Sequence, residues 1–183
     1  MEIQPVVSRV IELFDSTCVK QFESMGCEIS QMDAPSGSPD MASSYIDAAN
    51  DDLSVKLLIH SAYSLLEHTM PSDVLEWTKN LELQEDWNSE LANRFVCRLK
   101  NKLISHDCNL KMGLPTICSR DQAEKYLEGE GQKCARFFKV AHPETDDVIE
   151  CSLLIELRNK GLSLSDYEDE DEDWFSESDL EHL

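Results

Sequence analysis

Asp86, Glu90 and Asn93 are spaced so that a helix would bring their side chains onto one face. An α-helix turns about 100° per residue, so with Asp86 at the origin Glu90 lies at about 40° and Asn93 at about 340°. Cys97 falls on the same stripe, at about 20°. A carboxamide both donates and accepts hydrogen bonds, so it can hold a water beside an anion that a carboxylate would repel.

A helix over 86–105 is predicted to carry this stripe. Apolar residues recur every four positions on the opposite side of the helical wheel: Leu91, Phe95, Leu99 and Leu103. A polar stripe is also what the wet side of any amphipathic helix presents. Asp86, near the start of the helix, would complement the helix dipole without any further role. The stripe alone therefore leaves both interpretations open.

The run 90–97 resembles the motif helix of the CheC/CheX/FliY chemotaxis phosphatases. That pattern has Asp or Ser, then Glu at the fourth position after it, then Asn three further on, and a later Pro. Four residues match it in order: Asp86, Glu90, Asn93 and Pro115. Twenty-one residues separate Asn93 from Pro115, one fewer than the usual spacing, and 113–116 resembles the family's segment around its Pro. The resemblance covers 4–157 in outline and is specific over 86–116.

The resemblance implies that the substrate is the aspartyl phosphate of a response-regulator receiver domain, which is CheY-like. Asn93 would orient the attacking water, and Glu90 would form a salt bridge with a lysine of the receiver. Asp86 and Cys97 would lie at the docking surface, where the family often has Gly at the position of Cys97. Pro115 would hold the chain beside the motif helix. Phosphoryl transfer depends largely on such positioning and on charge stabilisation.

The resemblance also implies a homodimer, with no cofactor of its own and with Mg²⁺ held by the partner receiver. Members with two motifs repeat the pattern on the first helix, and Ser8, Glu12 and Asp15 stand at that spacing here. An ionised Asp has no amide donor. The first helix is therefore expected to lack a working site, as in a single-motif, CheX-like protein.

The remaining segments predict an α/β (α+β) domain of CheC/CheX-like fold, with long helices packed on an antiparallel sheet. The expected helices cover 5–25, 62–70 and 72–77, and the expected strands cover 27–32, 43–49, 53–60, 134–141 and 148–157. The segment 108–114 is expected to be extended, because Pro115 disfavours a helical conformation at Leu114. Asn50-Asp51-Asp52 is typical of a hairpin turn. The segments 33–41 and 122–131 are polar and are expected to be loops. One domain would occupy 1–160, followed by an acidic, disordered tail over 161–183.

The net charge of −21, from 37 acidic and 16 basic residues, disfavours nucleic acid and anionic membranes as partners. Ten of the acids lie in 165–183 with no Lys or Arg, so this tail is expected to be solvated. Trp174 and Phe175 within it leave open a short motif that docks on a basic surface. No apolar run is long enough to span a membrane and no signal peptide is evident, so a cytoplasmic location is expected.

The seven cysteines and five histidines show no metal-ligand spacing, and His106 with Cys108 lacks further partners. Reduced, partly buried thiols are the simplest expectation. Two other functions stay open: a non-catalytic receiver-binding adaptor in two-component or chemotaxis signalling, and a structural component of the flagellar switch. No extra switch-binding domain is recognisable in the sequence, which disfavours the second.

Overall fold

A computed structural model of the chain describes residues 4–34, 40–71, 80–142 and 145–164. The expected helix over 72–77 lies outside these residues, as do Trp174, Phe175 and nearly all of the expected tail. The described helices are α1 (Pro5–Glu23), α2 (Tyr63–Thr69), α3 (Leu81–Ile104) and α4 (Arg120–Tyr126). The strands are β1 (Glu28–Met32), β2 (Met41–Ala49), β3 (Leu53–Ala62), β4 (Lys111–Met112), β5 (Thr116–Ile117), β6 (Gln132–His142) and β7 (Thr145–Leu157).

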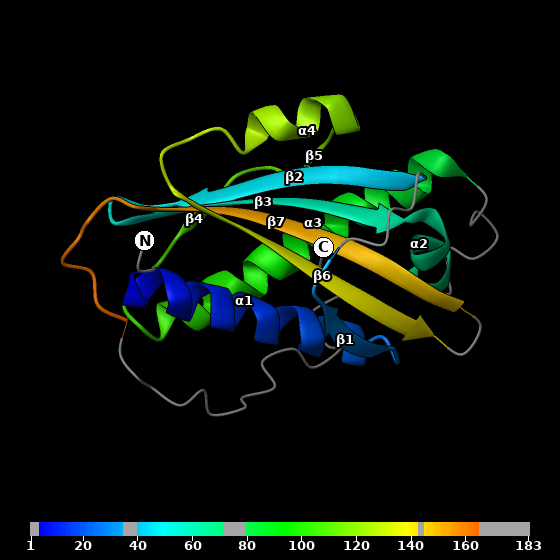
Figure 1. The fold of residues 1–183 in the computed structure, drawn as a ribbon, viewed down its shortest axis with the longest axis horizontal. Coiled ribbons are helices and arrows are strands. Elements are labelled where there is room, and N and C mark those ends of the chain that lie inside the picture. Colours follow the sequence, from blue (N-terminus) through cyan, green and yellow to red (C-terminus); the bar gives the residue numbers. More distant parts are fainter. Residues whose placement is uncertain (1–3, 35–39, 72–79, 143–144, 165–183) are drawn as a thin grey trace, which may run out of the picture.

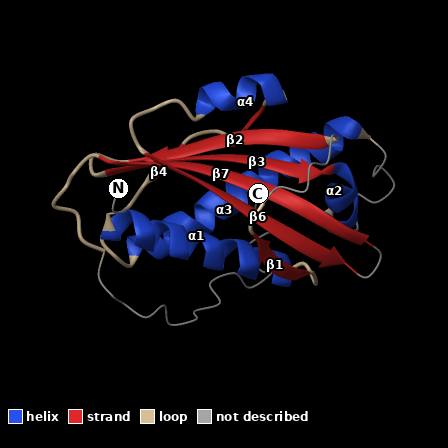
Figure 2. Ribbon diagram, viewed as in Figure 1, coloured by secondary structure: helices blue, strands red, loops and turns tan. Residues whose placement is uncertain are grey.

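The strands form one antiparallel sheet in the order β1-β6-β7-β3-β2-β4, with β5 also paired to β2 (Figure 1). The β2–β3 hairpin turns at Asn50, whose side-chain oxygen accepts hydrogen bonds from the backbone N–H groups of Asp52 and Leu53. Helices and strands are separated along the chain rather than alternating regularly (Figure 2). The predicted α+β class with long helices on an antiparallel sheet is confirmed.

The main core lies between the sheet and the pair of helices α1 and α3. Successive strand residues point to opposite faces, and on β3 it is Leu57 and Ile59 that join this core. Phe95 of α3 links the two helices, with its ring centroid 6.2 Å from Phe14 and 5.9 Å from Phe22 of α1. The buried side of α3 is therefore fixed by contacts with both α1 and the sheet.

The shorter helix α4 packs on the other face of the sheet, over β2 and β3. Tyr126 stacks on Tyr45 with ring centroids 4.3 Å apart, and Leu58 and Ala123 are buried nearby. This region was predicted to be a loop over 122–131, and that prediction is wrong for its first half. The sequence of α4 is polar with few apolar positions, so its contacts with the sheet stabilise a helix that periodicity does not reveal.

The start of the motif helix differs from the prediction. The motif helix α3 begins at Leu81 rather than at Asp86, because Asn80 caps it: the side-chain oxygen of Asn80 accepts from the N–H of Glu82 at 2.9 Å. The stretch over 108–114, predicted to be extended, contains the short strand β4, and β5 follows it along the edge of β2. None of the helices within the described residues is long and apolar enough to cross a membrane.

Candidate functional site

The exposed side of α3 carries the stripe predicted from the sequence. Asp86 is exposed, while Glu90, Asn93 and Cys97 are partly exposed on successive turns. The opposite side of the helix is fully buried, including Leu91, Phe95 and Leu99. The same helix therefore fixes its position through the core and presents two carboxylates, an amide and a thiol outward.

Hydrogen bonds between α3 and β2 set how far the helix lies along the sheet. The Nδ2 of Asn88 donates to Ser44 Oγ at 2.9 Å, and the hydroxyl oxygens of Ser44 and Ser89 lie 3.1 Å apart. Asn88 and Ser44 are fully buried, so these bonds replace the water lost by the Asn88 Nδ2 and the Ser44 hydroxyl, whereas Asn88 Oδ1 is buried without a hydrogen-bond partner among the described residues. At the other end of β2, the Nδ2 of Asn50 lies 3.7 Å from the Sγ of Cys108, just beyond α3. The helix and β2 therefore run side by side in the same direction.

Glu90 has two partners within its own helix. Arg94 donates from Nε to Glu90 Oε1 at 2.8 Å, and Asn93 donates from Nδ2 to Glu90 Oε2 at the longer distance of 3.4 Å. Because the amide nitrogen of Asn93 faces Glu90, its carbonyl oxygen Oδ1 is the group left to meet a water or a partner. The pair predicted to be catalytic is thus in direct contact.

Arg94 was not singled out from the sequence, although it stands at the site. Its guanidinium lies over the ring of Trp87, 4.9 Å from the centroid. Trp87 is nearly buried, and its Nε1 donates to Thr69 Oγ1 at 3.0 Å. The ring of Trp87, which is bonded to α2, therefore supports the guanidinium of Arg94 in its contact with Glu90. The spacing of Glu90 and Arg94, four residues apart with the acid first, is the sequence signal that could have revealed this pair.

Pro115 lies in a segment that follows the free edge of β2. Gly113 donates its N–H to the carbonyl of Asp47 at 2.8 Å, and Cys118 donates to the carbonyl of Ser43 at 3.1 Å. Between them, β5 pairs with β2 and also contacts α3. The segment around Pro115 is therefore next to the motif helix, as the role predicted for Pro115 requires.

On α1, the residues at the spacing of the motif, Glu12 and Asp15, do not contact one another as Glu90 and Asn93 do but pair with arginines. Arg136 of β6 donates from Nε to both carboxylate oxygens of Asp15, at 3.0 and 3.1 Å. Burial raises the pKa of Asp15 above its ordinary value, and the nearby Arg136 opposes this only in part. Glu12 pairs with Arg9 at 3.3 Å. Asp15 therefore serves the packing of α1 on the sheet, and α1 offers no amide beside Glu12.

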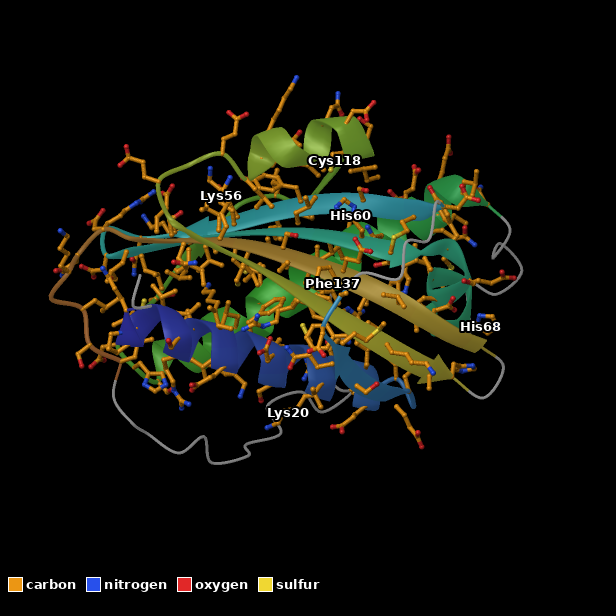
Figure 3. All side chains as sticks on the ribbon, in the orientation of Figure 1. Lys20, Lys56, His60, His68, Cys118 and Phe137 are labelled. Carbon is orange, nitrogen blue, oxygen red and sulfur yellow. The ribbon has the colours of Figure 1, made fainter. Side chains whose placement is uncertain are left out.

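A separate polar cluster lies on the α4 face of the sheet, away from the stripe. The Oγ of Ser43 and the Nδ1 of His60 are 2.7 Å apart, and His60 is opposite Glu150 in the β3–β7 register. Figure 3 shows His60 within the sheet and Cys118 near α4. Ser43, His60 and Glu150 are each less than 9% exposed, so the hydrogen-bonded pair of Ser43 and His60 is buried and is not an accessible nucleophile.

The cysteines do not form a site. Five of the seven are buried, and Cys97 and Cys134 are partly exposed. Burial raises the pKa of Cys134 to about 11, which disfavours its thiolate. Within the described residues no group of three or more His, Cys, Asp or Glu side chains is arranged to hold a metal ion. His106 and Cys108 are both buried at the end of α3.

No protein-family model matches the chain, and no curated protein matches it. Solved structures do match it. The chemotaxis protein CheX from Vibrio vulnificus aligns with a TM-score of 0.60 and 17% identity, over 80% of this chain and 96% of that one. CheX in a CheX–CheY–BeF3–Mg complex from Borrelia burgdorferi aligns with a TM-score of 0.55 and 13% identity, over 80% and 97%.

A domain of another protein has a similar structure. The FliM middle domain from H. pylori aligns with a TM-score of 0.52 and 9% identity, over 80% of this chain and 88% of that one. At such low identity these likenesses bear on the fold and not on the activity. Together with the sheet order and the placement of α3, they show that this chain has the CheC/CheX-like fold that its motif helix led us to expect.

Proposed function

We propose that this chain is a phosphatase that hydrolyses the aspartyl phosphate of a CheY-like receiver domain. The observation that carries the proposal is the contact between Glu90 and Asn93 on the outward stripe of α3, in a chain of CheC/CheX-like fold. The Borrelia burgdorferi neighbour was solved with CheY bearing a beryllofluoride group and Mg²⁺, which supports a receiver as the partner. A cytoplasmic homodimer is part of the same proposal.

The reaction requires little chemistry from this chain. A water oxygen attacks phosphorus in line with the aspartyl oxygen, the P–O bond to that oxygen breaks, and the products are the free carboxylate and inorganic phosphate. Asn93 Oδ1 would accept a hydrogen bond from the water and fix its position, while the neutral amide avoids repelling the phosphoryl oxygens. The receiver would supply Mg²⁺ and a lysine, so no cofactor of this chain's own is proposed.

Glu90 would dock the receiver's lysine and so set the distance from Asn93 to the phosphoryl group. Asp86 and Cys97 flank the pair on the same stripe and would contact the receiver's rim. Pro115 would keep the edge segment beside α3. Positioning of this kind accounts for much of the rate gain available to an enzyme that adds no covalent step.

The test is the loss of labelled phosphate from purified receiver domains of the same genome. The wild-type chain should accelerate the loss for at least one receiver, and Asn93→Ala should abolish that acceleration while still binding the receiver. Asn101→Ala is the matched control, since Asn101 is exposed on the same helix about 12 Å further along. Acceleration that survives in Asn93→Ala would contradict the role of Asn93.

A non-catalytic adaptor is the second candidate, and one observation favours it. Glu90 is already paired with Arg94 at 2.8 Å, so the carboxylate that should dock a lysine carries a cation before any partner arrives. An adaptor would bind the phosphorylated receiver and leave its rate of phosphate loss unchanged. The same assay therefore separates the two candidates.

A further inference from the structure

Leu114 stands out on the surface beside the motif helix. It is 85% exposed, and Ile117 on the same short segment is 43% exposed. The backbone that presents them is held at both ends, by the bonds from Gly113 to Asp47 and from Cys118 to Ser43. Leu114 is thus an apolar side chain fixed outward by the edge of the sheet.

The register of the edge segment places Leu114 within about one strand residue of the level of Asn93. Gly113 bonds to Asp47 and Thr116 pairs with Tyr45, so Leu114 and Pro115 lie two or three residues along β2 from Ser44, roughly 7–10 Å. On α3, Asn93 lies four residues beyond Ser89, which contacts Ser44, or about 6 Å along the helix axis. The helix and β2 run in the same direction, so Asn93 is most nearly level with Pro115, and Leu114 lies about 4 Å further along.

The polar stripe alone is a poor source of affinity. Exposed ion pairs and hydrogen bonds contribute little to binding because water competes for them. Stable interfaces instead have a few apolar anchors at the centre, with polar contacts around them. A single exposed Leu would need no explanation elsewhere on the surface. Leu114 differs because it lies beside the residues that would meet the partner.

We propose that Leu114, assisted by Ile117, is the apolar anchor of the docking surface, and that the receiver domain covers it together with the stripe. This inference rests on the proposed function for its partner. The anchor would insert into an apolar patch next to the receiver's phosphorylation site while Glu90 reaches the lysine. The occupant follows from continuity: β5, on the same edge segment as Leu114, contacts α3, so a body that places its phosphoryl group at Asn93 of α3 would reach that segment as well.

The experiment compares Leu114→Ser with Ile104→Ser. Ile104 is 45% exposed at the far end of α3 and serves as the matched control. Leu114→Ser should raise the KM for the phosphorylated receiver about ten- to a hundredfold while kcat stays within about twofold. Ile104→Ser should leave both constants unchanged. Equal thermal midpoints would show that neither variant alters folding.

Binding separates this inference from the proposed function. A receiver that carries beryllofluoride and Mg²⁺ should bind wild type and bind Leu114→Ser at least tenfold more weakly, even if the wild-type chain proves to have no phosphatase activity. Unchanged binding by Leu114→Ser, an equal effect of Ile104→Ser, or no binding by wild type would each overturn the docking surface. A loss of dimer in Leu114→Ser on size exclusion would assign the anchor to a second copy of this chain and also overturn it.

Discussion

Arg94→Gln should strengthen binding of a phosphorylated receiver. In the free protein Arg94 holds Glu90 Oε1 at 2.8 Å and rests on Trp87. A lysine of the receiver that pairs with Glu90 must therefore approach a second cation on the same carboxylate. Gln has a similar helix propensity but is shorter and uncharged, so the variant removes the positive charge beside Glu90 together with the contact on Trp87.

The size of the effect follows from the geometry. An ammonium about 2.8 Å from Oε2 would lie roughly 5–6 Å from the Arg94 guanidinium. Two unit charges at that separation repel by about 0.8 kcal/mol in water and by about 3 kcal/mol at an effective dielectric of 20. Against this repulsion stands the benefit of the Arg94–Glu90 ion pair, which holds the Glu90 side chain in one orientation. An ion pair between residues four apart on a helix contributes about 0.3–0.5 kcal/mol. Repulsion exceeds ordering by about 0.4 kcal/mol in water and by about 2.6 kcal/mol at the effective dielectric of 20, so Kd should fall by about twofold at the least and about eightyfold at the most at low salt.

The assay is a titration of the receiver carrying beryllofluoride and Mg²⁺, at 0.05 M and 0.5 M salt. The gain for Arg94→Gln should be largest at low salt and shrink at high salt, because screening weakens the repulsion. Arg9→Gln is the control, since Arg9 forms a similar pair with Glu12 on α1, outside the motif helix. Weaker binding by Arg94→Gln at both salts would refute the reasoning and make Arg94 a residue that positions Glu90 for docking.

Three further predictions concern stability and reactivity. Phe95→Ala should lower the free energy of unfolding by about 3–5 kcal/mol in urea titrations, because Phe95 joins α1 to α3; a loss below about 1 kcal/mol would contradict this. Burial raises the pKa of Asp15 above its ordinary 3.8, so the folded state binds its proton more tightly and loses stability as pH rises from about 4. Asp15→Asn should therefore gain in unfolding midpoint relative to wild type between pH 4 and 7, whereas a shrinking difference would show that Arg136 dominates. Iodoacetamide should label Cys97 before the other cysteines in peptide mass spectra and block receiver binding; prior labelling of Cys134, whose pKa burial raises to about 11, would contradict this.

Elements that repeat apolar residues over several turns were predictable from the sequence. The buried side of α3 and the β2–β3 hairpin fall where periodicity and turn residues indicate. The helix α4 did not, because seven mostly polar residues give no stripe and its helix depends on Tyr126 packing on Tyr45. The start of α3 was missed because the residues before Asp86 break the four-residue repeat, although Asn80 as a cap is a local signal.

The composition of the site was predictable, but its partners were not. Glu90 and Asn93 share a face by helical geometry alone, so any helix over 86–105 would bring them together. The placement of the edge segment with Leu114 next to α3 depends on the pairing of β5 with β2, which joins segments some seventy residues apart. Local patterns carry no information about such a register. The role of Arg94 could not be predicted either, because it depends on the contact of Arg94 with Trp87. The position of Trp87 is fixed in turn by its hydrogen bond to Thr69 of α2.

The two hydrogen bonds of Glu90 indicate how docking and catalysis would be linked. The charged bond from Arg94 is short, at 2.8 Å, whereas the neutral bond from Asn93 is long, at 3.4 Å, and therefore weaker. An arriving lysine would displace the weaker partner and take Oε2, because exchange at Oε1 would break the stronger bond and the contact of Arg94 with Trp87. The amide of Asn93 would then be released next to the phosphoryl group, with both its donor and its acceptor available for water. A partner that lacks a lysine at this place would bind without releasing Asn93, so the same surface would act as an adaptor towards one receiver and as a phosphatase towards another.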